Sequence, residues 1–150
     1  MRVNKSDVTL SFLNSGVVFW VKSKKQKLKD KAWKLYSEWI RRRDADKDGY
    51  VSCVTCKKRA HWKGEGMQAG HFIAGRTLSL LFDSRNCHCQ CYGCNVGRNG
   101  SYVEYFIYME QRYGREVIDE LRRLKHQSRK YGIGHYERLI DELDRSLAEL

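Results

Sequence analysis

Residues 85–95 read RNCHCQCYGCN, and the last two cysteines of this segment are spaced like those of the upstream segment CVTC at residues 53–56. Two CxxC pairs present four thiolates, which can close the tetrahedral coordination of a zinc ion and leave no open position for a substrate. A zinc bound in this way is structural rather than catalytic. We therefore predict a structural Zn²⁺ site made of Cys53, Cys56, Cys91 and Cys94.

Two other uses of the cysteines stay open. A CxxC pair can serve redox chemistry, but that motif is expected beside a βαβ unit, and this chain has two pairs and no such pattern. Cys87 and Cys89 crowd the second pair, so either could replace one of the four proposed ligands. We expect both to be strand residues or spare thiols.

The composition favours a nucleic-acid partner. Among 150 residues, 29 are Lys or Arg and 18 are Asp or Glu, which gives a net charge of +11. A basic balance of this size favours a polyanionic ligand. The N-terminus lacks a signal-peptide pattern, and the longest apolar run, residues 17–21, is too short to span a bilayer. We expect a soluble cytoplasmic protein, in a reducing compartment where clustered cysteines bind metal.

The first third of the chain is predicted to contain a strand pair and one helix. In residues 8–21, apolar side chains first alternate with polar ones and then cluster, around a predicted turn. An apolar stripe at helical spacing follows over residues 28–40, and the helix is expected to end in three arginines. Residues 44–49, DADKDG, resemble the start of an EF-hand loop, but Thr55 stands where the bidentate Glu is required. We predict an ordinary loop there.

Helices are expected again in the last third. Ser101 and Glu104 fit a capping box that opens a helix with Val103 and Ile107 on one face, and breaks are predicted at Gly114 and at residues 132–134. The fold class is therefore α+β, in one compact domain. Its predicted parts are an N-terminal extension, a basic helix and loop, a zinc-bound core and C-terminal helices, at residues 1–25, 26–49, 50–113 and 114–150.

A group of polar residues lies between and just after the cysteine pairs, namely His71, Asn86, His88 and Asn95. An imidazole that deprotonates water, an amide that orients the imidazole, and ligands that hold a divalent metal on the phosphate can together hydrolyse a phosphodiester. These four residues supply the required types. Each taken alone also fits a hydrogen-bonded residue of a non-catalytic zinc module, so both interpretations stay open.

The same region is predicted to form a hairpin, with residues 68–73 in the first strand and residues 85–88 in the second. Because side chains alternate along a strand, Asn86 and His88 share one face, from which we expect both to point at His71. Asn95 would then open the following helix. This arrangement gathers the four polar residues around one site.

The pattern from residue 41 to residue 105, with CVTC, QAGHFIAGR, LFDSRNCHCQCYGCN and NGSYVEY, resembles the NinG (Rap) recombination nucleases of lambdoid phages. More distantly, it is similar to HNH proteins such as phage endonuclease VII. The tail from Gly114 onward looks similar too, whereas residues before about 26 do not. The resemblance implies a zinc-stabilised ββα-metal (HNH) nuclease core with flanking α-helices, in a phage protein made inside the bacterial host cell.

The resemblance also implies roles for the polar residues. It makes His71 the general base, Asn86 its positioning partner, and Asn95 a ligand of the catalytic Mg²⁺ or Mn²⁺. Many HNH enzymes have an Asp immediately before the base, where this chain has Gly70. His88 is our candidate replacement, with its role open between metal ligand and phosphate contact.

The reaction implied by the resemblance is metal-dependent hydrolysis of branched DNA, such as Holliday junctions and D-loops. Resolving a four-way junction symmetrically would suit a homodimer. Two alternatives stay open, an HNH enzyme that cuts ordinary duplex DNA and a zinc-dependent DNA-binding protein without catalysis. Arginines are the expected phosphate contacts, although the last two of them could equally be solvated surface: Arg41, Arg42, Arg43, Arg76 and Arg85.

Overall fold

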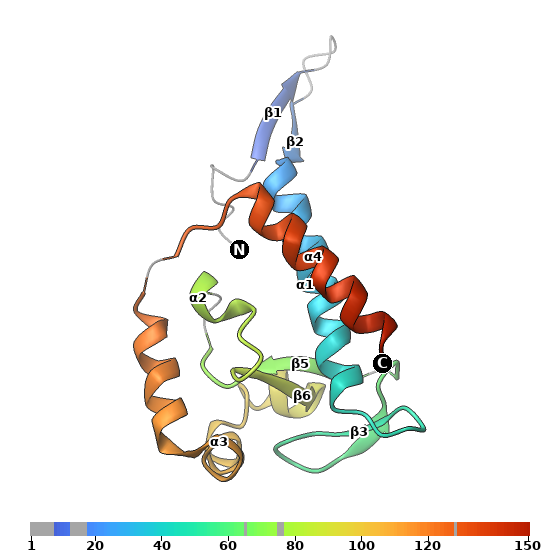
Figure 1. Ribbon diagram of the computed structural model, residues 1–150, viewed down its shortest axis with the longest axis vertical. Helices are drawn as coiled ribbons and strands as arrows, with labels where there is room; N and C mark the ends of the chain where they lie inside the picture. The colour runs from blue at the N-terminus through green and yellow to red at the C-terminus, as the bar shows by residue number, and fades with distance from the viewer. Residues whose placement is uncertain (1–7, 13–17, 65, 75–76, 128) are drawn as a thin grey trace.

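The computed structural model describes residues 8–12, 18–64, 66–74, 77–127 and 129–150, and their side chains from residue 21 onward. Within these ranges the chain forms three two-stranded antiparallel sheets and three long helices (Figure 1). The predicted α+β class is confirmed. None of the helices in the described ranges combines the length and apolar character needed to cross a bilayer.

The first two strands form the predicted pair, β1 (Val8–Phe12) against β2 (Val18–Lys22). Helix α1 (Lys24–Arg43) follows, and its N-terminus is capped by Ser23, whose hydroxyl accepts a hydrogen bond from the Gln26 amide at 3.2 Å. The helix ends in three arginines, which suit the negative end of its dipole. In the following loop, the Asp46 carboxylate accepts hydrogen bonds from the backbone amides of Asp48 and Tyr50. The loop predicted at residues 44–49 is therefore confirmed.

Two small hairpins make up the centre of the molecule. Strand β3 (Tyr50–Ser52) pairs with β4 (Arg59–His61), and β5 (Met67–His71) pairs with β6 (Cys87–Cys91). A short helix, α2 (Leu78–Leu81), lies between β5 and β6, and a π-helix, η2 (Gly93–Gly97), follows β6. The β5–β6 pair is the hairpin that the sequence predicts.

Two helices close the chain, α3 (Tyr102–Lys125) and α4 (Ile133–Ala148). Helix α3 is bent at Gly114, whose φ of 79° departs from helical geometry, and α4 begins directly after Gly132. The predicted break at Gly114 is therefore confirmed, and the one predicted over residues 132–134 is confirmed at Gly132 but not at Gly134, which lies inside α4. Since Gly114 needs a positive φ, a residue with a side chain is disfavoured there.

The start of α3 differs from the predicted capping box. Ser101 adopts a left-handed conformation with φ of 46°, and its hydroxyl makes no capping hydrogen bond. The expected apolar face is also wrong, because Val103 and Ile107 are exposed. The helix instead buries Tyr105 and Met109, which pack in one core cluster with residues of the β5–α2 segment.

The β5–β6 hairpin is covered on both faces, and all five residues of β6 are buried. On one face, Tyr36 and Ile40 of α1 pack against Ala69 and Cys87. On the other, the side chains of α3 approach the hairpin. Helix α4 runs along α1 (Figure 1) and buries apolar side chains against it, so the two helices together support the hairpin from one side.

The α1–α4 contact leads to a stability prediction. Ile140 is 4% exposed and packs with Ala32 and Tyr136, whereas Ile133, on the same helix, is 38% exposed. Ile140→Ala should lower the free energy of unfolding by roughly 2–5 kcal/mol, because it removes buried atoms and leaves a cavity. Ile133→Ala, the matched control, should change it by about 0.5 kcal/mol or less. Equal losses for the two variants in urea denaturation would contradict the packing described.

Candidate active site and metal centre

Four cysteine sulfurs converge where β3, β6 and η2 meet. The Sγ atoms of Cys53, Cys56, Cys91 and Cys94 all lie within 4.8 Å of one another, and those of Cys56 and Cys91 are 3.6 Å apart. A tetrahedral zinc with Zn–S bonds of about 2.3 Å has S–S edges of about 3.8 Å, so this geometry fits zinc. The predicted quartet is confirmed as a cluster that could hold the ion.

The other two cysteines are buried strand residues of β6, as expected. The Cys87 thiol lies in the core cluster with Tyr36 and Ile40, and Cys89 packs beside the cysteine quartet without belonging to it. Burial raises the pKa of the Cys89 thiol to about 12 and that of Cys87 above its usual range. Neither sulfur belongs to the group of four that lies close enough together to hold one ion.

His71 stands at the end of β5, at the mouth of a cleft of about 820 Å³. Its imidazole stacks on the Trp33 ring of α1, with ring centroids 5.3 Å apart and planes 20° apart. Its Nε2 lies 3.1 Å from the carbonyl oxygen of Leu81. Because a carbonyl only accepts, Nε2 carries the proton in this hydrogen bond, and Nδ1 is then the basic nitrogen.

Asn86 forms hydrogen bonds with the backbone that follows His71. Its side chain is fully buried, and its Oδ1 accepts a hydrogen bond from the Ile73 amide at 2.9 Å. Its Nδ2 donates to the Ile73 carbonyl at 3.4 Å. These bonds fix the chain two residues beyond His71 rather than the imidazole itself. Asn86 is therefore placed to position the base through the loop.

His88 does not face His71. In the β5–β6 register, His88 lies opposite Gly70, and His71 lies opposite Cys87. Directly opposed residues share a face of the sheet, so His88 and His71 point to opposite faces. The expected orientation of His88 toward the base is therefore wrong. Sequence periodicity fixed which residues of β6 share a face, but not which face His71 takes.

The His88 ring is instead part of a buried hydrogen-bond chain. The Tyr105 hydroxyl donates to the Gly70 carbonyl at 2.9 Å, so His88 Nδ1 donates to that hydroxyl at 3.0 Å. His88 Nε2 then accepts from the Tyr113 hydroxyl at 2.9 Å. With both ring nitrogens bonded to tyrosines, His88 is a support of the Gly70 backbone and not a metal ligand. Burial, aided by the charge of Arg43, lowers its pKa to about 4.

The side chain of Gln90 occupies the space beside Gly70. A Cβ atom at position 70 would lie 2.1 Å from Gln90 Oε1, so an Asp there would require Gln90 to move. Gln90 is fully buried, and its Nε2 donates to the Gly100 carbonyl at 2.9 Å. Within the described residues its Oε1 has no hydrogen-bond partner. Strand alternation could have placed Gln90 on the face of Gly70, but nothing in the sequence marked it as functional.

Asn95 lies on η2 and lines the same cleft as His71. Its Nδ2 donates to Gln68 Oε1 at 2.8 Å, which fixes the orientation of the amide and leaves Oδ1 as an oxygen donor for a ligand. Of the four polar residues singled out in the sequence, the structure brings His71 and Asn95 to the cleft. It places Asn86 behind the loop and His88 on the far face of the hairpin.

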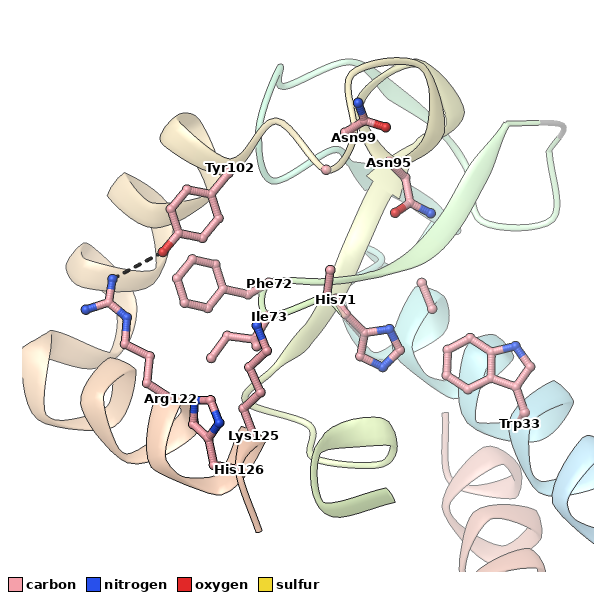
Figure 2. A pocket seen from close by; sticks show the side chains of 13 residues that line it. Trp33, His71, Phe72, Ile73, Asn95, Asn99, Tyr102, Arg122, Lys125 and His126 are labelled. Atoms are coloured by element: carbon pink, nitrogen blue, oxygen red, sulfur yellow. Dashed lines mark hydrogen bonds between the residues drawn. The ribbon is translucent and has the colours of Figure 1, made fainter. Parts of the chain in front are cut away.

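The facing wall of the cleft is basic and comes from the two ends of α3 (Figure 2). Arg122, Lys125 and His126 line it near the C-terminus of the helix, and Tyr102 lines it at the N-terminus. Among the described residues that line the cleft, none is acidic. Sequence patterns did not predict these residues, because the bend at Gly114 brings the far end of α3 to the cleft.

Four of the arginines expected to contact phosphate are described by the structure, and they lie outside the lining of this cleft: Arg41, Arg42, Arg43 and Arg85. Arg43 is held by the Asp44 carboxylate at 2.7 and 2.9 Å and by the Ser84 and Cys87 carbonyls. Arg41 reaches the Met67 carbonyl at 3.5 Å.

Two further arginines are also paired. Arg42 lies 3.7 Å from the Glu38 carboxylate, and Arg85 forms ion pairs with Asp83 and Glu120. These contacts correct the view of Arg85 as a phosphate clamp, because its guanidinium already has two carboxylate partners. Arg76 lies outside the described residues.

Comparison with known proteins gives a consistent set of relatives. A family model described as "Bacteriophage Lambda NinG protein" matches residues 19–150. Protein ninG of Escherichia phage 933W is 31% identical over 106 residues, which is 69% of this chain and 44% of that protein. Protein ninG of Escherichia phage lambda is 29% identical over 135 residues, 88% of this chain and 57% of that protein. The chain thus spans about half the length of these relatives. No solved structure matches it.

The cysteine cluster leads to a prediction on metal content. Cys91→Ser should lose about one zinc per chain and unfold the central hairpins, because structural zinc contributes roughly 10–16 kcal/mol in small finger peptides. Cys87→Ser is the matched control, a buried thiol of the same strand outside the quartet. It should keep the zinc. Metal analysis and thermal melting of both variants test this, and a native protein without zinc would contradict the assignment.

The buried His88 leads to a prediction on pH. Its pKa falls from 6.5 to about 4 on folding, so between these values the unfolded chain binds a proton that the folded chain does not. The stability linked to His88 is complete above about pH 6.5 and is lost as pH falls toward 4, by about 3 kcal/mol in all.

A His88→Gln variant isolates this effect, because zinc release at low pH affects both proteins alike. Its free energy of unfolding should approach that of the wild type as pH falls from 7 to 4.5. Two stability curves that run parallel over this range would show that His88 is not held neutral.

Proposed function

The chain belongs to the family of bacteriophage lambda NinG proteins, and from this premise we propose that it is an HNH-type (ββα-metal) DNA endonuclease. One observation carries the proposal. His71 and Asn95 share a cleft whose facing wall is basic and whose described lining is free of acidic side chains. This combination suits a general base acting on a phosphodiester.

The surrounding architecture supports this proposal. An antiparallel hairpin, β5–β6, is followed by η2 and α3, and the cysteine cluster ties the end of the hairpin to the preceding chain. A ββα-metal nuclease has the same order, with the base on the first strand and a metal ligand after the second. His71 and Asn95 occupy these two places.

His71 is the proposed general base. Its Nδ1 takes a proton from the attacking water, while the Leu81 carbonyl holds the Nε2 proton. The imidazolium that results is stabilised by this carbonyl and by the face of the Trp33 ring, which stacks on it. Both contacts favour the protonated product of the step, so they assist proton removal. A positioned base of this kind contributes roughly 10²–10⁴ in rate.

The oxygen donors of the cleft fit a hard divalent metal that enters with the DNA. Asn95 Oδ1 is such a donor. Mg²⁺ commonly keeps several waters and takes few protein ligands besides substrate phosphates. When bound, Mg²⁺ or Mn²⁺ would stabilise negative charge on the scissile phosphate and the leaving oxygen. His88 has no part in this ligand set.

The substrate class proposed is branched DNA, as the family resemblance implies. Lys125 would contact a backbone phosphate on the wall that faces His71, and Arg122, whose Nη1 also lies 3.4 Å from the Asp119 carboxylate, would contact a second. Such contacts position DNA without reading its sequence. A homodimer is the proposed form on a four-way junction, since two cuts would then be related by symmetry.

One observation favours a second candidate, a zinc-dependent DNA-binding protein without catalysis. Position 70 is Gly, and Gln90 fills the space where an Asp ligand would stand. This protein would bind junctions and leave them uncut. An HNH enzyme for ordinary duplex would cut the linear arms as well as the junction, so comparing the two substrates separates it from the main proposal.

The proposed role of His71 leads to a mutational prediction. His71→Ala should slow cleavage of a junction by at least 10²-fold while zinc content, melting temperature and DNA affinity stay close to those of the native protein, because the base acts only in the chemical step. His135→Ala, a histidine of α4 outside the cleft, is the matched control. A His71→Ala protein that cuts at the native rate would overturn the mechanism.

A further inference from the structure

An aromatic pair stands on the cleft wall opposite the His71–Trp33 stack (Figure 2). The rings of Phe72 and Tyr102 are stacked, with centroids 5.3 Å apart and planes 8° apart. Phe72 is buried at 3% exposure, whereas Tyr102 is 49% exposed. One face of the tyrosine ring is therefore backed by a fixed ring.

The tyrosine is also fixed at its hydroxyl. Arg122 Nη2 donates to the Tyr102 hydroxyl at 3.2 Å, so the guanidinium and the ring lie together on the cleft wall. Lys125 lines the cleft next to them. An exposed aromatic face with cations beside it is the arrangement by which proteins bind the base and the phosphate of one nucleotide.

We infer that Tyr102 is a stacking subsite for one unpaired DNA base, with Arg122 and Lys125 holding the adjoining phosphate. Inside a duplex, both faces of a base are covered by its neighbours, so a tyrosine ring can stack only on a base that is single-stranded or extruded. The cleft volume of about 820 Å³ is within the range of roughly 300–1,000 Å³ that encloses whole small molecules. The cleft therefore has room for a whole nucleoside and not merely for a phosphate group.

The subsite lies next to the proposed reaction centre. Phe72, on which Tyr102 stacks, directly follows His71, and the two side chains point apart, Phe72 toward Tyr102 and His71 toward Trp33 (Figure 2). This step rests on the proposed nuclease function. The substrate is then a DNA that has an unpaired nucleotide beside the scissile phosphate. Flaps and gaps provide such a nucleotide, and a base extruded at a branch point would provide one too, whereas a fully paired linear duplex does not.

The test is binding of a single-stranded probe by the full chain without added divalent metal. The probe is a 12-nucleotide thymidine oligomer with one 2-aminopurine, labelled at its end for anisotropy. Tyr102→Ala should weaken binding roughly 5- to 150-fold and abolish quenching of the 2-aminopurine. Tyr102→Phe should keep both. Tyr102→Leu, which retains apolar packing on Phe72 without an aromatic face, should behave like the alanine variant.

Two controls separate stacking from charge. Tyr92→Ala removes a tyrosine that is 55% exposed and outside the cleft lining, so it should bind like the wild type. Lys125→Ala should lower the slope of log K against log salt by about 0.7, whereas Tyr102→Ala should leave the slope unchanged. Equal affinities for Tyr102→Ala and Tyr92→Ala would overturn the inference, as would a slope change in Tyr102→Ala.

The outcome does not depend on cleavage. If the chain binds the probe through Tyr102 but does not cut DNA, the subsite is supported and the nuclease proposal is contradicted. If the wild-type chain cuts junctions and the Tyr102→Ala variant binds the probe as tightly as the wild type does, only the proposed subsite is contradicted.

Discussion

The Sγ atoms of Cys53 and Cys56 lie within 4.8 Å of those of Cys91 and Cys94, and the chain between the two pairs carries His71. Two-stranded hairpins are marginal by themselves in water. A four-thiolate zinc would tie the β3–β4 and β5–β6 hairpins to η2 and so fix the start of α3. The positions of His71 on β5 and Asn95 on η2 both depend on this junction.

Buried polar side chains then hold the backbone on either side of His71. The chain of hydrogen bonds from Tyr113 through His88 and Tyr105 ends on the carbonyl of Gly70, directly before the base. Asn86 holds Ile73, two residues after the base. Because buried polar groups cost free energy unless they are paired, these networks specify one backbone path. His88 and Asn86, which the sequence suggested as catalytic residues, therefore help to position the imidazole of His71.

The sequence predicted what depends on local spacing. The CxxC pairs predicted the cluster of four cysteines, apolar patterning predicted the β1–β2 pair and the long helices, and glycines predicted the breaks at Gly114 and Gly132. It misplaced His88, because alternation relates residues of one strand while the register against β5 depends on the intervening turn. It missed Lys125 and Arg122, because their approach to His71 depends on the bend in α3. It assigned Arg85 to DNA, because charge counts do not show its partners Asp83 and Glu120.

We propose that the β5–β6 hairpin, beside a cysteine cluster that could hold zinc, presents His71 in a basic cleft for hydrolysis of branched DNA. The most direct measurement is incubation of the purified wild-type chain with an end-labelled four-way junction and with its linear arms, in Mg²⁺, in Mn²⁺ and without added metal. The account predicts metal-dependent cuts near the branch point that leave 5′ phosphate and 3′ hydroxyl ends, with the linear arms intact. A junction that is bound but stays uncut with either metal would contradict it.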